Sequence, residues 1–158
     1  MFKKLLVPID GSKHSLHALE KAILIARKFE GELTLLHVYS VGYPITRGAF
    51  DMGETEAVAS VLVSEVNEEV RKAGKGILSD GKRRANAEGI QVDVLLREGH
   101  AVEEILRTAE DGGFDLIVIG ARGLSRVKRI LLGSVSQGVT THAHCPVLVI
   151  KQPLEISG

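Results

Sequence analysis

Five short, nearly continuous apolar runs punctuate the chain, and they limit its possible folds more than any other feature of the sequence. They occupy residues 5–7, 33–38, 92–96, 116–119 and 147–150. A strand is apolar on both sides when helices cover both faces of its sheet, which is the usual state of a parallel sheet. We therefore expect five buried parallel strands.

Helical patterns separate these runs. Apolar residues at three- and four-residue spacing follow the first and third runs: Leu16, Leu19, Ile23 and Ala26 in one case, and Val102, Ile105, Leu106 and Ala109 in the other. A last helix is expected to start near Gly133. This alternation predicts right-handed crossovers and a doubly wound α/β sheet. We expect one domain over residues 1–152, followed by a short C-terminal tail at 153–158.

The longest helical pattern covers residues 54–88 and contains Gly74, Gly76 and Gly81. A glycine inside a helix costs about 1 kcal/mol relative to alanine. We therefore expect a kink or break near these glycines. Residues 40–53, which precede this helix, form the one long irregular connection, and loops of this length are often functional.

The composition narrows the class of protein. Lys plus Arg and Asp plus Glu number 20 each, so the chain lacks the basic excess of a dedicated nucleic-acid binder. No apolar stretch approaches the ~20 residues that span a bilayer. The single cysteine, Cys145, cannot form an internal disulfide, which fits a reducing compartment. These observations favour a cytoplasmic protein that binds neither nucleic acid nor a membrane.

The net charge of zero conceals an uneven distribution of charged residues along the sequence. Residues 51–70 carry six acids and no Lys or Arg, whereas residues 116–151 carry five basic residues and no acid. Four of these five lie close together: Arg122, Arg126, Lys128 and Arg129. Such a cluster is usually a solvated face, but its position within a glycine motif favours a role beside an anion.

The first and fourth runs end in residues that suit a phosphate ligand. The first is followed by Asp10-Gly11-Ser12, and the fourth leads through Gly120 and Gly123 to Gly133-Ser134. Ligands of open parallel sheets bind at the carboxyl ends of the strands. Glycines let backbone amides approach an anion, and a helix that begins near Gly133 would direct free amides towards it. The alternative is that the glycines only turn the chain and that Ser134 only caps a helix; the glycines alone leave both interpretations open.

The spacing Gly120-x2-Gly123-x9-Gly133-Ser134 resembles the signature of the ATP-binding branch of the universal stress protein family. The opening Leu-Val-Pro-Ile-Asp-Gly-Ser and the closing Cys-Pro-Val-Leu-Val-Ile-Lys are similar to that family as well. The resemblance extends over the whole chain. It implies a five-stranded sheet in the order 3-2-1-4-5, which would place the first and fourth strands side by side.

The resemblance also implies a nucleotide site, a metal ion and a homodimer. The strand-one loop and a backbone contact at strand two would meet the adenosine, whereas the glycine loop and the last helix would hold the ribose and phosphates. The implied residues are Pro8, Ile9, Asp10, Val38, Gly120, Arg122, Gly123, Gly133, Ser134, Val135 and Ser136. The cofactors would be ATP or AMP with Mg²⁺ or Mn²⁺, the ion being held by phosphate oxygens and water.

Two departures from the family pattern concern the last helix. Gly138 lies inside it and should weaken it, and His144 stands where the family often has proline. Neither removes an implied ligand. The last run, Val147, Leu148, Val149 and Ile150, is a candidate edge strand and is expected to mediate the homodimer.

The functional hypothesis is a stress-response binding module whose nucleotide occupancy biases its dimer surface or an unknown protein partner. The alternative is a slow ATPase or autophosphorylating enzyme in which Asp10, Ser134 or Ser136 takes part. Catalysis needs a positioned nucleophile or base, and the sequence shows hydroxyls without an evident base. Binding is therefore favoured over catalysis.

Overall fold

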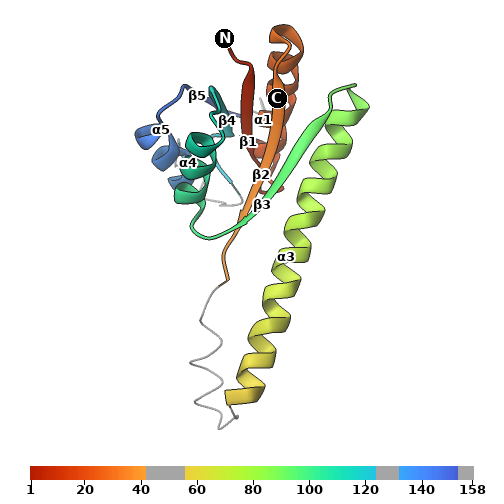
Figure 1. Cartoon of the computed structure of the whole chain (residues 1–158), viewed down its shortest axis with the longest axis vertical. Helices are drawn as coiled ribbons and strands as arrows, with labels where there is room; N and C mark the ends of the chain where they lie inside the picture. The colour runs from red at the N-terminus through yellow and green to blue at the C-terminus, as the bar shows by residue number, and fades with distance from the viewer. Residues whose placement is uncertain (42–55, 124–131, 153–158) are drawn as a thin grey trace, which may run out of the picture.

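The computed structural model describes residues 1–41, 56–123 and 132–152, with side chains in the second range described from residue 60. Five strands alternate with helices along the chain (Figure 1). The strands are β1 (Lys4–Pro8), β2 (Glu32–Tyr39), β3 (Val92–Glu98), β4 (Leu116–Gly120) and β5 (Val147–Ile150). The helices are α1 (Lys13–Phe29), α3 (Glu56–Ala87), α4 (Ala101–Asp111) and α5 (Ser134–His142).

The strands form one parallel sheet in the order β3-β2-β1-β4-β5. Each of the five apolar runs is a strand, as predicted, and the order is the one that the resemblance implies. The change of direction in this order falls between β1 and β4, which are adjacent. Ligand crevices of doubly wound sheets form at such a point, outside the carboxyl ends of the strands.

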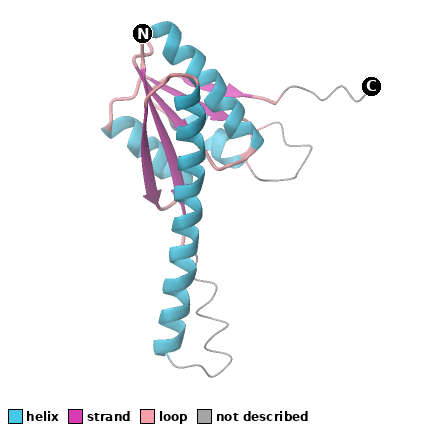
Figure 2. Ribbon diagram, turned by 90° about the vertical axis from the view of Figure 1, so that its right-hand side faces the viewer, coloured by secondary structure: helices cyan, strands magenta, loops and turns pink. Residues whose placement is uncertain are grey.

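Helices cover both faces of the sheet, which explains why the central strands β1 and β4 are apolar and buried, whereas the outer strands β3 and β5 are partly exposed. Leu5 and Val7 of β1 face α1 and α3, whereas Leu6, between them, faces α4 and α5. All three side chains are fully buried. Figures 1 and 2 show the resulting three layers, with the sheet between the two helix pairs.

Helix α3 is continuous over 32 residues, so the break predicted at its glycines is wrong. Two of the glycines lie where the helix packs closely on the sheet. A β-carbon at Gly74 would lie 2.8 Å from Cδ2 of His37, and one at Gly81 would lie 2.9 Å from Cδ1 of Ile9. The burial gained by this close approach offsets the low helix propensity of glycine.

Gly138 has a similar explanation in α5. A β-carbon at this position would lie 2.9 Å from Cγ2 of Val102, so the missing side chain lets α5 pack directly on α4. The glycine that was expected to weaken this helix therefore permits its tertiary contact. Among the helices of the described ranges, none combines the length and apolarity that a bilayer crossing requires.

Gly74 and Gly76 provide a matched test of this packing. Gly76→Ala should raise the free energy of unfolding by about 1 kcal/mol, because its β-carbon would meet nothing within 4 Å. Gly74→Ala should have a lower free energy of unfolding than wild type, because overpacking costs about 1–3 kcal/mol. Urea denaturation followed by circular dichroism measures both, and equal stabilisation by the two changes would contradict the packing of Gly74 on His37.

Candidate functional site

A cavity of ≈ 370 Å³ lies at the carboxyl edge of the sheet. The ends of β1, β2 and β4 and the first turns of α1, α4 and α5 form its walls. All eleven residues implied by the sequence resemblance line this one cavity: Pro8, Ile9, Asp10, Val38, Gly120, Arg122, Gly123, Gly133, Ser134, Val135 and Ser136. Six further lining residues are Ser15, Leu36, His37, Ala101, Ile105 and Ile119.

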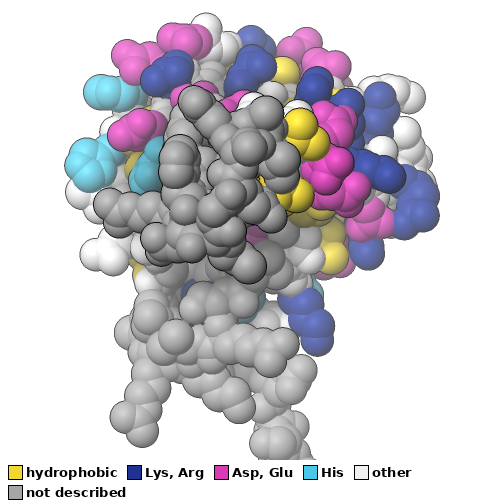
Figure 3. Space-filling view, turned by 90° about the horizontal axis from the view of Figure 1, so that it is seen from below, with side chains coloured by type: hydrophobic (Ala, Val, Ile, Leu, Met, Phe, Trp, Pro, Cys, Tyr) yellow, Lys and Arg dark blue, Asp and Glu magenta, His cyan; other side chains and the backbone are white. Residues whose placement is uncertain are grey.

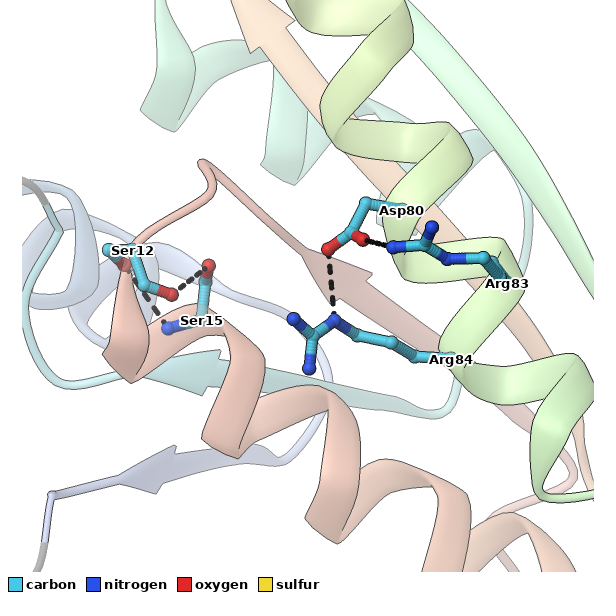
Figure 4. Close-up of polar contacts among 5 residues, drawn as sticks. All are labelled: Ser12, Ser15, Asp80, Arg83 and Arg84. Carbon is cyan, nitrogen blue, oxygen red and sulfur yellow. Dashed lines mark hydrogen bonds and ion pairs between the residues drawn. The ribbon is translucent and has the colours of Figure 1, made fainter.

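The loop after β1 is held by a local network of hydrogen bonds. The Ser12 amide donates to Oδ1 of Asp10 at 2.9 Å, and the Asp10 amide donates to Oγ of Ser15 at 3.3 Å. Ser12 also caps α1, since its Oγ accepts from the Ser15 amide at 3.2 Å (Figure 4). These contacts fix the Asp10 carboxylate at the cavity wall.

The loop after β4 approaches the β1 loop so closely that two of its positions exclude a side chain. A β-carbon at Gly120 would lie 2.7 Å from the backbone carbon of His14. One at Gly123 would meet Oδ2 of Asp10. Glycine at these positions therefore does more than turn the chain, because it brings the two loops to one cavity.

The start of α5 is attached directly to the end of β4. The Gly133 amide donates to the Ala121 carbonyl at 2.7 Å, and the buried Ser136 hydroxyl donates to the Gly120 carbonyl at 2.5 Å. Gly133 is the N-cap, so the alternative that Ser134 serves as the helix cap is wrong; Ser134 is the first helical residue and is exposed. The amides of a first helical turn lack partners within the helix and suit an anion.

The cavity has an apolar side and a polar side, which follow from the strand order. Leu36 and Val38 of β2 and Ala101 and Ile105 of α4 lie on one side of β1. The glycine loop, Arg122 and the start of α5 lie on the other. This arrangement suits a ligand with an apolar ring at one end and anionic oxygens at the other.

His37 links the cavity to the sheet. Its Nδ1 lies 2.7 Å from the Ile9 carbonyl oxygen, and its ring packs where Gly74 of α3 has no side chain. The neighbouring Val38 was identified from the end of the second apolar run. His37 precedes Val38 in the chain, so its place near the carboxyl end of the same strand could have identified it as a lining residue as well.

The electrostatic field at the polar side is cationic. Burial lowers the pKa of His14 below its ordinary value of 6.5, and the charges of Arg122 and His17 lower it further, whereas Asp10 opposes them. His14 lies in the first turn of α1, where the helix dipole also disfavours a proton. Its Nδ1 is buried without a hydrogen-bond partner among the described residues.

Three parts of the sequence analysis lie outside the described residues. These are most of the irregular connection at 40–53, the basic residues Arg126, Lys128 and Arg129, and the C-terminal tail at 153–158. Within the described ranges, no three His, Cys, Asp or Glu side chains come together as a metal site.

The fold and the cavity define a doubly wound α/β domain with a ligand-type cavity at its switch point. The sequence model of the universal stress protein family matches residues 1–151, and the chain belongs to this family. A curated relative, the universal stress protein YxiE of Bacillus subtilis, is 37% identical over 96% of this chain and 100% of its own.

Solved structures give the same result. Universal stress protein UspA from Lactobacillus plantarum superposes with a TM-score of 0.79 at 25% identity, over 94% of this chain and 97% of that one. A universal stress protein solved in complex with cAMP superposes with a TM-score of 0.66 at 25% identity, over 95% of this chain and 97% of that one.

The cationic field can be tested on the protein without ligand. The His14 ring, assigned by comparison with His14→Gln, should titrate below pH 6.5 in an NMR pH series. Arg122→Gln should raise the pKa of His14, although burial keeps it below the ordinary value. Arg107→Gln, on the exposed face of α4, is the matched control and should leave it unchanged. A wild-type midpoint at or above 6.5 would contradict this account.

Proposed function

We propose that the cavity binds an adenine nucleotide, ATP or AMP, and that occupancy biases the dimer surface or a protein partner in a cytoplasmic stress response. The observation that carries the proposal is the gathering of the β1 loop, the glycine loop after β4 and the start of α5 around one cavity. The cAMP complex of a similar universal stress protein supports an adenine nucleotide as the ligand class.

The two sides of the cavity would take the two ends of the nucleotide. Leu36, Val38 and Ile105 provide apolar surface for the base. Arg122 and the free amides of the first turn of α5 suit the phosphates, because charge-assisted hydrogen bonds to phosphate are strong. Gly120 and Gly123, where a β-carbon would meet His14 and Asp10, let the loop after β4 lie against the loop after β1 on this side.

A Mg²⁺ or Mn²⁺ ion would accompany the phosphates. Such ions prefer oxygen ligands, and Mg²⁺ retains much of its water. Phosphate oxygens and water can therefore supply most of the coordination. The carboxylate that lines the cavity is that of Asp10. When bound, the ion would neutralise phosphate charge beside a loop that already carries Arg122.

The hydrogen bond made by the buried Ser136 hydroxyl favours binding over catalysis. Ser136 donates its proton to the Gly120 carbonyl, so this hydroxyl anchors α5 to β4. The exposed Ser134 is free of this task and lies at the helix start, where it can donate to a phosphate oxygen. The proposal therefore assigns Ser136 to support of the site and Ser134 to ligand contact.

A double substitution tests the site. Gly123→Val with Ser134→Ala should weaken ATP binding at least a hundredfold, because each lost charge-assisted contact contributes about 1.5–3 kcal/mol. Isothermal titration calorimetry measures the affinity. Gly76→Val with Ser79→Ala, on the outer face of α3, is the matched control and should bind like wild type. Unchanged affinity in a correctly folded Gly123→Val/Ser134→Ala protein would refute the site assignment.

The dimer is a second part of the proposal. Among the described strands, β5 pairs only with β4, and its Leu148 side chain is 38% exposed. The amides of Ile117 and Ala121 donate to the carbonyls of Pro146 and Ile150, so the backbone groups of alternate residues such as Val149 point to the free edge. We propose that a second copy pairs with this edge, which would otherwise remain an unpaired template.

A proline substitution tests the edge. Val149→Pro removes the amide that points outward and leaves the hydrogen bonds to β4 in place. It should convert the dimer to a monomer in light scattering at micromolar concentration. Val149→Ala, which keeps the amide, should remain dimeric. A wild-type protein that is monomeric under the same conditions would contradict pairing through β5.

A further inference from the structure

The chain leaves the sheet at the end of β1, and one peptide unit there is held from both sides. The Ile9 amide still belongs to the sheet, since it donates to the Leu36 carbonyl at 2.8 Å. The next peptide unit, made of the Ile9 carbonyl and the Asp10 amide, contacts two side chains instead. Nδ1 of His37 in β2 lies 2.7 Å from the carbonyl oxygen, and Oγ of Ser15 in α1 accepts from the amide at 3.3 Å. Two other elements thus fix the peptide that precedes Asp10.

The hydrogen bond between His37 and Ile9 has a defined direction. A carbonyl oxygen can only accept a hydrogen bond, so Nδ1 of His37 carries a proton and donates it to this contact. The other ring nitrogen, Nε2, lies on the side of α3, where a β-carbon at Gly74 would be 3.3 Å from it. The contact therefore fixes the orientation of the ring as well as the position of its proton.

Packing holds the His37 ring in this orientation. A β-carbon at Gly74 would lie 2.8 Å from Cδ2 of the ring, so the ring occupies space that this glycine leaves free. Leu96, the β3 residue paired with His37, lies against the same position, with its Cδ1 3.0 Å from that β-carbon. A donor whose own orientation is set by its neighbours can position the group to which it donates.

The residue that follows this peptide presents a carboxylate to the cavity. Asp10 lines the cavity, and its Oδ1 accepts from the Ser12 amide at 2.9 Å. Its Oδ2 lies beside Gly123 of the opposite loop, where a β-carbon would meet it. A carboxylate accepts hydrogen bonds, and the ribose hydroxyls of a nucleotide are donors that suit it. Rotation of the Ile9–Asp10 peptide would move this carboxylate, because the side chain extends from the α-carbon that ends the peptide.

We propose that His37 is a positioning residue of the nucleotide site. Its Nδ1–H group holds the Ile9 carbonyl and thereby directs the Asp10 carboxylate to the hydroxyl groups of the ribose. Although His37 lines the cavity, this donor is directed at the protein backbone and not at the ligand space. The inference rests on the proposed function, because it concerns the same cavity, and it adds a residue of β2 that acts on the ligand through another residue.

Two substitutions of the same shape separate the hydrogen bond from the packing of the ring. In His37→Asn the side-chain amide nitrogen takes the place of Nδ1, because both atoms are bonded to Cγ, whereas His37→Leu has the same branching without a donor. His37→Asn should bind AMP within about threefold of wild type, and His37→Leu should bind it about tenfold more weakly, the loss expected from one hydrogen bond. Isothermal titration calorimetry measures both affinities.

An exposed histidine provides the matched control. Figure 3 shows histidine side chains at the surface on the left, the side on which Figure 1 shows α4 and α5. His142, at the end of α5, makes the same kind of contact as His37, since its Nδ1 lies 3.0 Å from the Gly138 carbonyl oxygen. His142→Leu should bind AMP like wild type. Similar losses in His37→Leu and His142→Leu, or equal affinities of His37→Asn and His37→Leu, would overturn the proposal.

A ligand without ribose hydroxyls separates positioning from general damage to the cavity. Dideoxy-AMP, which lacks both ribose hydroxyls, offers the Asp10 carboxylate no sugar donor, so His37→Leu should weaken its binding by less than about twofold. Circular dichroism shows that the variants compared are folded. If AMP and dideoxy-AMP lose affinity equally, His37 supports the cavity as a whole, and the proposal is wrong.

The direction of the hydrogen bond can be measured without any ligand. In a long-range proton–nitrogen NMR spectrum, Nδ1 of His37, assigned by the loss of its signals in His37→Asn, should have the chemical shift of a protonated nitrogen. An unprotonated Nδ1 would by itself overturn the proposal. A wild-type protein that binds neither AMP nor ATP would refute the proposed function and this role of His37 together. Wild-type binding with equal affinities of His37→Asn and His37→Leu would refute the role of His37 alone.

Discussion

The close approach of the β4 end to the start of α1 is the constraint on which the site depends. A β-carbon at Gly120 would lie 2.7 Å from the backbone of His14, so no other residue fits there without displacing a helix. The contact lets Ala121 accept from the Gly133 amide and lets Gly120 accept from the Ser136 hydroxyl. Strand β4, helix α1 and helix α5 are thereby joined at one point.

The polarity of the cavity follows from the sheet order around this point. Because β1 lies between β2 and β4, the strand end that carries apolar Val38 and the loop that carries Arg122 face each other across β1. The same arrangement places the first turns of three helices around the cavity, each with the positive end of its dipole directed towards the carboxyl edge of the sheet. The lowered pKa of His14 reflects burial within this cationic surrounding.

Much of the fold could be predicted because a strand that is buried on both faces of its sheet is apolar at nearly every position. A run such as Leu116 to Gly120 is buried at every position, and few other structures tolerate that composition. The strand order could not be derived from such runs, because an apolar run indicates a strand without showing which strands are its neighbours; the order came from a resemblance. The expected break in α3 was wrong because helix propensity is local, whereas Gly74 and Gly81 serve contacts with strands far away in the sequence.

The site, like the fold, could be predicted where its residues are close in sequence and not where they are brought together only by folding. Glycine spacing and a helix start identified the polar side, since those features are continuous in sequence. Leu36, Ile105 and Ile119 were missed because a lining residue on an apolar strand or helix has the same composition as a core residue. Only the three-dimensional arrangement distinguishes them.

The side chain of His37 lies between the cavity and α3. His37 contacts the Ile9 carbonyl through Nδ1 and packs against Gly74, the first buried residue of the described part of α3. The described side chains of α3 before this contact, residues 60–73, include none that is buried. A ligand that displaces the β1 loop must therefore act on His37 and, because interiors are close-packed, on the position of α3. The proposed effect of occupancy on partner binding thus has a physical path of two contacts, from Ile9 to His37 and from His37 to Gly74.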